Sequence, residues 1–195
     1  MIAPAFADPV FQSQTAYRAM LAEMSRPGNI IRFGVDLAPP APLTAAAAAA
    51  LLTLVDFETS LWLSPAFADS EVAAWLRFHT EAQIVGSPDR ATFALVDLEL
   101  DALDLASCAQ GTASYPDRST TIVVQVASLS VAGALRLSGP GVRGEARFDF
   151  APRPADFLAQ WRANSAKFPL GVDLIFATRD RFASLPRSTR ILGAA

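Results

Sequence analysis

The chain has 195 residues, of which 52% are hydrophobic and 18% are charged, and its formal net charge is -3. This length fits a single domain over residues 1–195 with a substantial core, and the composition is unlike that of disordered chains. Because the net charge provides no basic field to attract phosphate backbones, we do not expect nucleic acid to be a partner.

Cysteine and histidine each occur once, as Cys108 and His79. A single thiol forms no intrachain disulfide, which favours a reducing cytoplasm as the compartment. Two such donors fall short of the roughly three or four ligands that zinc sites take from a protein, and no acidic cluster has EF-hand spacing. We therefore expect no metal site built on Cys and His.

The amino-terminal segment does not resemble a signal peptide, because it lacks a cationic region and carries Asp8-Pro9 where the apolar stretch would continue. The longest apolar run, residues 45–55, is about half of the roughly 20 residues that cross a bilayer. Its six consecutive alanines favour a buried helix with a smooth surface. The sequence therefore predicts no membrane span.

Helices and strands are predicted to alternate along the chain, from apolar spacing of three and four residues and from unbroken or alternating apolar runs. In the first half we expect helices over 13–25 (capped by Ser13), 45–55 (capped by Thr44), 69–79 (capped by Asp69) and 100–108, and strands over 29–35, 61–63, 82–85 and 91–96. In the second half we expect strands over 120–129, 134–137, 145–150, 172–177 and 182–185, and a helix over 154–166.

This interspersed order favours a three-layer α/β or a mixed α+β domain over a bundle or a barrel. The nearly unbroken apolar run at residues 122–126 predicts a central strand covered on both faces. Gly139 to Gly144 match the G-x-G-x-x-G pattern of dinucleotide-binding loops. No helix is predicted to follow this segment, so we interpret it as a glycine-rich connection between strands.

Single residues offer few candidates for catalysis. His79 lies on the apolar stripe of a predicted helix end, and is either a hydrogen-bonded structural residue or a general base. Arg77 is most simply a solvated helix residue. Asp173 stands one residue into an apolar strand, so it needs either a structural partner, such as loop amides or an arginine, or a role in a site. Cys108 has no adjacent cation to lower its pKa and is interpreted as inert.

Short segments along almost the whole chain make it similar to the H-subunit family of the bacterial carbon-phosphorus lyase system. These segments are residues 24–28 (MSRPG), 52–56 (LTLVD), 76–80 (LRFHT), 125–129 (QVASL), 168–174 (FPLGVDL) and 185–189 (LPRST). None is a catalytic signature alone, but their order and spacing together are specific.

The resemblance implies a role in phosphonate catabolism. In that family the G, H, I and J subunits form a core complex, and methylphosphonate is joined to the ribose of ATP with loss of adenine. The nucleosidase chemistry is attributed to the I subunit, and a radical iron-sulfur subunit later breaks the carbon-phosphorus bond. The H subunit is expected to be a homodimer or to dock on the J subunit.

The resemblance also implies a three-layer αβα sandwich with a mixed sheet, similar to the large domain of type I pyridoxal-phosphate transferases without their cofactor site. We expect no bound pyridoxal phosphate. The sequence agrees, because the Schiff base needs a lysine and Lys167, at a predicted helix end, is the only one in the chain.

Two hypotheses for the function remain. The first is a non-catalytic accessory subunit that acts through its interfaces, and we prefer it because nucleophiles are sparse and the hydrophobic fraction is high. The second is a subunit that binds or transforms a phosphorylated ligand in an arginine-lined pocket. We assign no catalytic or metal-binding residue. The candidate ligand or interface residues are Arg77, His79, Arg118, Arg136, Phe168, Pro169, Gly171, Asp173 and Arg187.

Overall fold

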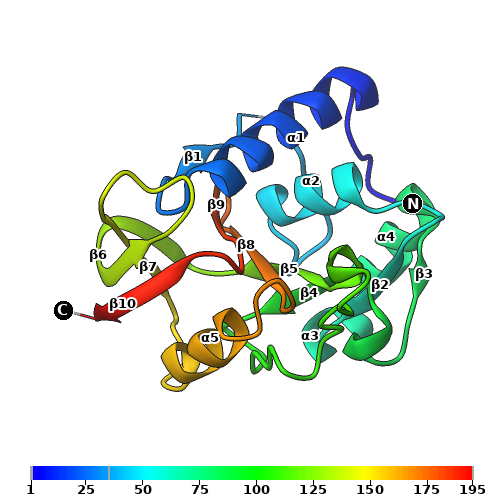
Figure 1. The fold of residues 1–195 in the computed structure, drawn as a ribbon. Helices are drawn as coiled ribbons and strands as arrows, with labels where there is room; N and C mark the ends of the chain where they lie inside the picture. Colours follow the sequence, from blue (N-terminus) through cyan, green and yellow to red (C-terminus); the bar gives the residue numbers. More distant parts are fainter. Residues whose placement is uncertain (1, 35, 195) are drawn as a thin grey trace.

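The computed structural model describes residues 2–34 and 36–194 and is built around a seven-stranded mixed sheet of order β1-β9-β8-β5-β4-β2-β3 (Figure 1). Its strands are β1 (Ile31–Arg32), β2 (Ser60–Leu63), β3 (Gln83–Ile84), β4 (Phe93–Asp97), β5 (Thr121–Gln125), β8 (Asp173–Ala177) and β9 (Arg181–Leu185). Strands β3, β2, β4, β5 and β8 are parallel, and β9 is antiparallel to both β8 and β1. The predicted α/β class with a mixed sheet is confirmed.

Helices cover one face of this sheet. They are α1 (Pro9–Ser25), α2 (Ala45–Leu54), the single turn α3 (Pro65–Ala68) and α4 (Glu71–Thr80). The alanines of α2 from Ala46 to Ala50 are fully buried, and Thr44 caps the helix by accepting a hydrogen bond from the Ala47 N–H. The predicted buried alanine helix is therefore confirmed, and its smooth surface lets α1 pack across it.

The opposite face is covered by α5 (Phe157–Ser165), by residues 98–108, and by a small antiparallel sheet of order β10-β6-β7. The small sheet consists of β6 (Ser128–Ser138), β7 (Ala146–Ala151) and β10 (Arg190–Ala194). Two 3-10 turns, η1 (Pro88–Arg90) and η2 (Pro116–Arg118), complete the secondary structure of the described residues. The expected αβα sandwich thus needs a correction, because β-structure and an irregular segment share one outer layer with a single helix.

Several helix boundaries differ from the predicted ones for reasons of local hydrogen bonding. Helix α1 begins at Pro9 because the Asp8 carboxylate accepts the Phe11 N–H at 3.1 Å and proline suits the first helical position. Helix α4 is capped by Ser70 instead of Asp69. The predicted helix over 100–108 is wrong, since aspartates such as Asp104 accept nearby backbone N–H groups and favour turns.

The glycine-rich segment 139–144 connects β6 to β7 without a helix, which confirms its interpretation as a strand connection. Gly141 has φ +79° and packs against the end of α1, where a Cβ atom would lie 2.0 Å from the Ser25 carbonyl oxygen. The strand expected over 29–35 is reduced to β1, and Val35 lies outside the described residues. Within the described ranges, none of the helices has the length and apolar character to span a bilayer.

Glu23 is an acidic residue on the otherwise apolar inner stripe of α1. Together with Ala16 and Met20 it lies on the buried side of the helix, and it is only 5% exposed. Its Oε2 atom has no hydrogen-bond partner among the described residues. Burial raises the pKa of this carboxyl from 4.5 to about 7, although the charge of Arg26 acts to lower it.

This buried carboxyl should make stability depend on pH. The folded pKa lies above the ordinary value, so the contribution of Glu23 to the free energy of unfolding falls as pH rises from about 4.5 to about 7. Glu23→Gln cannot ionise and should therefore gain stability relative to the wild type between pH 5 and pH 8. Urea unfolding at both pH values measures this difference. The exposed control Glu58→Gln should show no such gain, and an equal gain in both variants would contradict the assignment.

Candidate functional site

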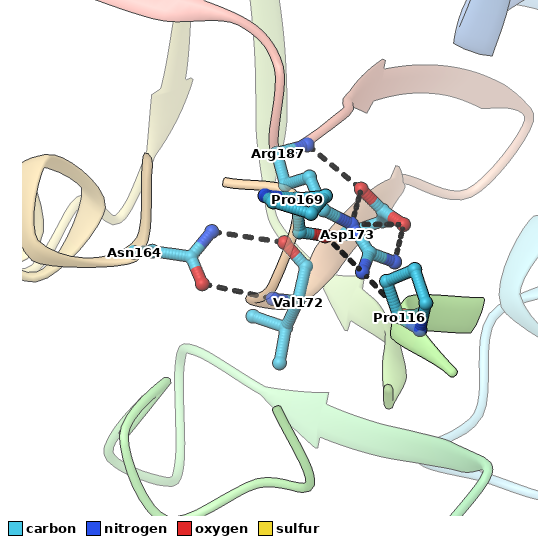
Figure 2. Close-up of polar contacts among 6 residues, drawn as sticks. All are labelled: Pro116, Asn164, Pro169, Val172, Asp173 and Arg187. Atoms are coloured by element: carbon cyan, nitrogen blue, oxygen red, sulfur yellow. Dashed lines mark hydrogen bonds and ion pairs between the residues drawn. The ribbon is translucent and has the colours of Figure 1, made fainter. Parts of the chain in front are cut away.

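Asp173 and Arg187 meet at the amino-terminal edge of the parallel strands (Figure 2). Asp173 is the first residue of β8, and Arg187 follows β9, which returns antiparallel beside it. Arg187 Nε donates to both carboxylate oxygens at 3.1 Å, and Nη2 donates to Oδ2. The Arg187 backbone N–H also donates to Oδ1, at 2.7 Å. Both side chains are only 14% exposed, so little water competes with this charge-assisted pairing.

Arg187 also holds two backbone carbonyls from other segments. Its Nη1 donates to the Pro116 carbonyl at 2.9 Å and to the Pro169 carbonyl at 3.4 Å. The guanidinium therefore ties η2 and the loop after α5 to the start of β8. Since these contacts engage most of its five N–H donors, Arg187 has little capacity left to bind an anionic ligand.

Asn164, a residue of α5 that the sequence analysis did not single out, also holds the loop between α5 and β8. The Asn164 side chain donates to the Val172 carbonyl at 2.9 Å and accepts the Val172 N–H at 2.8 Å. Gly171 has φ +109°, and a Cβ atom there would lie 2.7 Å from the Asn164 amide oxygen. A detectable signal existed, because Asn164 is a polar residue on the helix stripe of Phe157 and Trp161.

Two surface cavities flank the Asp173–Arg187 pair and share Phe168, Arg187 and Ser188 in their linings. One, of about 340 Å³, opens toward η2 and the end of α1. The other, of about 310 Å³, opens toward the β6–β7 connection and the start of β10. Phe168 is 61% exposed between them, so the loop presents an apolar ring beside polar walls.

The remaining candidate arginines lie apart from this pair or at its border. Arg118 belongs to η2 and stacks over the Tyr115 ring, 4.1 Å from its centroid. Arg136 lies on the small sheet and forms an exposed ion pair with Glu145 at 2.9 Å. Its hydrogen bond holds the pKa of Glu145 below the usual range. Neither guanidinium lines the two cavities.

Arg77 and His79 lie on α4, at a different place in the molecule. Arg77 is exposed, as expected of a solvated helix residue. His79 is half-buried, and its Nε2 lies 3.0 Å from the Ala3 carbonyl, which also accepts the Trp75 indole N–H. The histidine therefore fastens the amino-terminal segment, and neither residue joins Phe168, Pro169, Gly171, Asp173 and Arg187.

The carboxyl-terminal edge of the sheet, where ligands of open α/β sheets usually bind, carries a closed polar network. The buried Gln125 side chain donates to Asp97 at 2.6 Å and to the Pro42 carbonyl at 2.9 Å, and it accepts the Thr44 N–H at 2.8 Å. The other Asp97 oxygen accepts the Glu99 N–H. These side chains join the start of α2 to the strand ends, so their polar atoms are engaged within the protein.

The thiol of Cys108 and the amine of Lys167, the candidates for a nucleophile and for a Schiff base, are not available for chemistry either. Burial raises the pKa of the Cys108 thiol to about 11, which keeps it protonated at neutral pH. The Lys167 Nζ donates to the Gln110 side chain at 2.9 Å on the surface. Over the part of the chain that the structure describes, no three His, Cys, Asp or Glu side chains are grouped in a way that suits a metal ion.

Comparison with known families matches residues 4–192 to the bacterial phosphonate metabolism protein (PhnH) family. Because the match extends over nearly the whole fold, the chain belongs to this family, which confirms the resemblance noted from its sequence. One relative is subunit PhnH of alpha-D-ribose 1-methylphosphonate 5-triphosphate synthase from Rhizobium meliloti (strain 1021), 41% identical over 96% of this chain and 94% of the relative. Another is the putative C-P lyase subunit protein HtxG from Stutzerimonas stutzeri, 31% identical over 92% of this chain and 86% of the relative.

The Asp173–Arg187 ion pair should contribute far more to the free energy of unfolding than the exposed Arg136–Glu145 pair. Asp173→Ala leaves the Arg187 guanidinium without its carboxylate in a site that water scarcely reaches, so we expect a loss of about 3 kcal/mol in the free energy of unfolding. The matched variant Glu145→Ala breaks the exposed pair with Arg136 and should change stability little. Chemical denaturation at neutral pH measures both, and similar losses would contradict this ranking.

Proposed function

We propose that the protein is an accessory subunit, without catalysis of its own, of the assembly that forms ribose 1-methylphosphonate 5-triphosphate from ATP and methylphosphonate. The observation that carries the proposal is its membership of the phosphonate metabolism family, with a relative named as a subunit of this synthase over 94% of its length. The proposed partners are the G, I and J subunits of the carbon-phosphorus lyase complex, in the reducing cytoplasm.

The accessory role is supported by the state of the groups that would otherwise perform chemistry. Asp173 and Arg187 are engaged with one another and with the backbone, and His79 contacts a backbone carbonyl. The thiol of Cys108 is buried and protonated. Each of these contacts stabilises a loop or a terminus, which is what a subunit that acts through its surfaces requires.

We also propose that the fold resembles the large domain of type I pyridoxal-phosphate transferases and that the subunit nevertheless binds no pyridoxal phosphate. The seven-stranded mixed sheet with one inner antiparallel strand is compatible with that resemblance. Lys167 is hydrogen-bonded at the surface, on the side of α5. The network around Gln125 occupies the sheet edge at which α/β proteins usually hold a ligand.

Growth on methylphosphonate as the sole phosphorus source should follow assembly of the complex. In a strain that lacks the chromosomal gene for this subunit, folded His79→Ala and Cys108→Ser variants should restore growth, because neither side chain is proposed to react. Loss of a general base or nucleophile would instead cost about 10²-fold or more in rate. Pull-down with a tagged partner subunit measures assembly alongside growth.

Asp173→Asn is the most informative variant in the same strain, because it keeps the shape of the side chain and removes its charge. Loss of growth together with loss of assembly would support a structural carboxylate near a contact surface. A folded, fully assembled but inactive His79→Ala or Asp173→Asn protein would contradict the accessory role.

We propose that the isolated subunit forms a homodimer through the outer face of α1. Val10, Tyr17 and Leu21 are 74%, 50% and 55% exposed, and their spacing places them on one side of the helix. Such an apolar stripe is costly to leave in water, and two-fold pairing is the commonest way to cover it.

Light scattering on purified protein should therefore give the mass of a dimer. Leu21→Glu places a charge in the stripe and should shift the protein to monomer. The control Leu100→Glu alters a 64% exposed leucine in the irregular segment after β4 and should remain a dimer. A wild-type monomer at high concentration, or a dimeric Leu21→Glu, would contradict this interface.

A further inference from the structure

The cavity of about 310 Å³ is lined by polar and charged residues that have no part in the proposed accessory role. It lies where the β6–β7 connection, the end of α5 and the segment before β10 meet, and Ser138, Ser165 and Ser188 line it. The Ser165 hydroxyl donates to the Thr189 carbonyl at 3.2 Å, so Ser138 and Ser188 are the serines with a hydroxyl proton available. Ser138 and Arg190 are register partners of β6 and β10. Directly opposed residues of antiparallel strands project to the same side of a sheet, so this pairing brings an arginine beside the hydroxyls.

Arg190 is the cation of this cavity that has no counter-ion. Its guanidinium makes neither an ion pair nor a side-chain hydrogen bond within residues 2–34 and 36–194, whereas Arg187 in the same lining is neutralised by Asp173. Among the described residues, no carboxylate lines the cavity, although the chain as a whole is acidic with a net charge of -3. The cavity is therefore a locally positive pocket.

The close approach of two backbone segments forms one wall of this pocket. Gly139 has φ +137°, and a Cβ atom there would lie 2.9 Å from the Ser188 carbonyl oxygen. A larger residue would push the β6–β7 connection away from Ser188 and open the pocket. The exposed ring of Phe168 lines another side and supplies an apolar surface next to the donors.

These features point to a particular chemical class of ligand. A guanidinium without a counter-ion, beside the hydroxyls of Ser138 and Ser188, suits an oxyanion, because arginine donates two parallel hydrogen bonds to neighbouring oxygens. Ligand pockets usually have volumes of about 300–1,000 Å³, so this cavity suits a small ligand. We propose that the Arg190 pocket binds a tetrahedral phosphorus oxyanion, with Phe168 available to pack against a small organic substituent.

Three sources of such an oxyanion can be distinguished by titration. Inorganic phosphate tests the bare anion, methylphosphonate adds one methyl group, and ATP adds a triphosphate chain with a nucleoside. Calorimetric titration of the isolated full-length protein with each compound gives a dissociation constant independent of complex assembly. Failure of this proposal and failure of the accessory role are therefore separate results.

The variants test Arg190 directly. Arg190→Gln removes the charge and should weaken binding of the tightest probe by about tenfold or more, because a charge-assisted bidentate contact is lost. Arg190→Lys keeps the charge but loses the planar pair of N–H donors, so its dissociation constant should lie between those of the wild type and Arg190→Gln. The matched control Arg136→Gln removes an arginine of the same small sheet from outside the pocket, and it should bind like the wild type.

A local reporter links binding to this place in the structure. The Trp161 indole N–H donates to the Thr189 carbonyl at 3.0 Å, between the lining residues Ser188 and Arg190. The NMR signal of this indole N–H should keep the dispersed chemical shift of a folded protein in every variant. It should shift when the wild type is titrated with a ligand that binds. Binding that depends on Arg190 and moves this signal supports the pocket, and the probe that binds identifies the source. Absence of binding by all three probes, or equal losses in Arg190→Gln and Arg136→Gln, would overturn it.

Discussion

An aspartate and an arginine that water scarcely reaches hold together segments that are far apart in the sequence. Asp173 begins β8, and Arg187 extends its guanidinium past that carboxylate to the carbonyls of Pro116 and Pro169. A cation with a planar fork can satisfy a carboxylate and two carbonyls at once, which a lysine could not do in the same geometry. The loop after α5 and the turn η2 take their positions from this contact, and both flanking cavities take a wall from it.

The two edges of the sheet have different roles because their polar groups are satisfied differently. At the carboxyl-terminal edge, Gln125 and Asp97 use their hydrogen-bonding atoms within the protein, so that edge stabilises the start of α2. At the amino-terminal edge, the Asp173–Arg187 pair is also satisfied, whereas the neighbouring Arg190 is exposed and has no counter-ion among the described residues. The proposed anion site therefore lies at the border with the small sheet and not at either edge of the seven-stranded sheet.

Local chemistry explains which parts of the sequence analysis succeeded. The alanine run, its Thr44 cap and the apolar strand at β5 were predicted because their signals are contained in a few consecutive residues. The segment 100–108 was wrongly predicted as a helix, since its aspartates form turns and residues distant in sequence bury Leu103 and Leu105. Strand β10 was missed because its pairing with β6 depends on a partner more than 50 residues earlier.

The sequence by itself determined the family, the α/β class and the need for a partner at Asp173, since each follows from residue types and their spacing. Only the tertiary structure decided which partner that was, and it selected Arg187 because antiparallel strands bring β8 and β9 together. The same holds for Arg190, which one sequence cannot distinguish from the many other arginines of this chain. Whether a guanidinium is neutralised or free depends on neighbours supplied by folding, and these neighbours are not its neighbours in the chain.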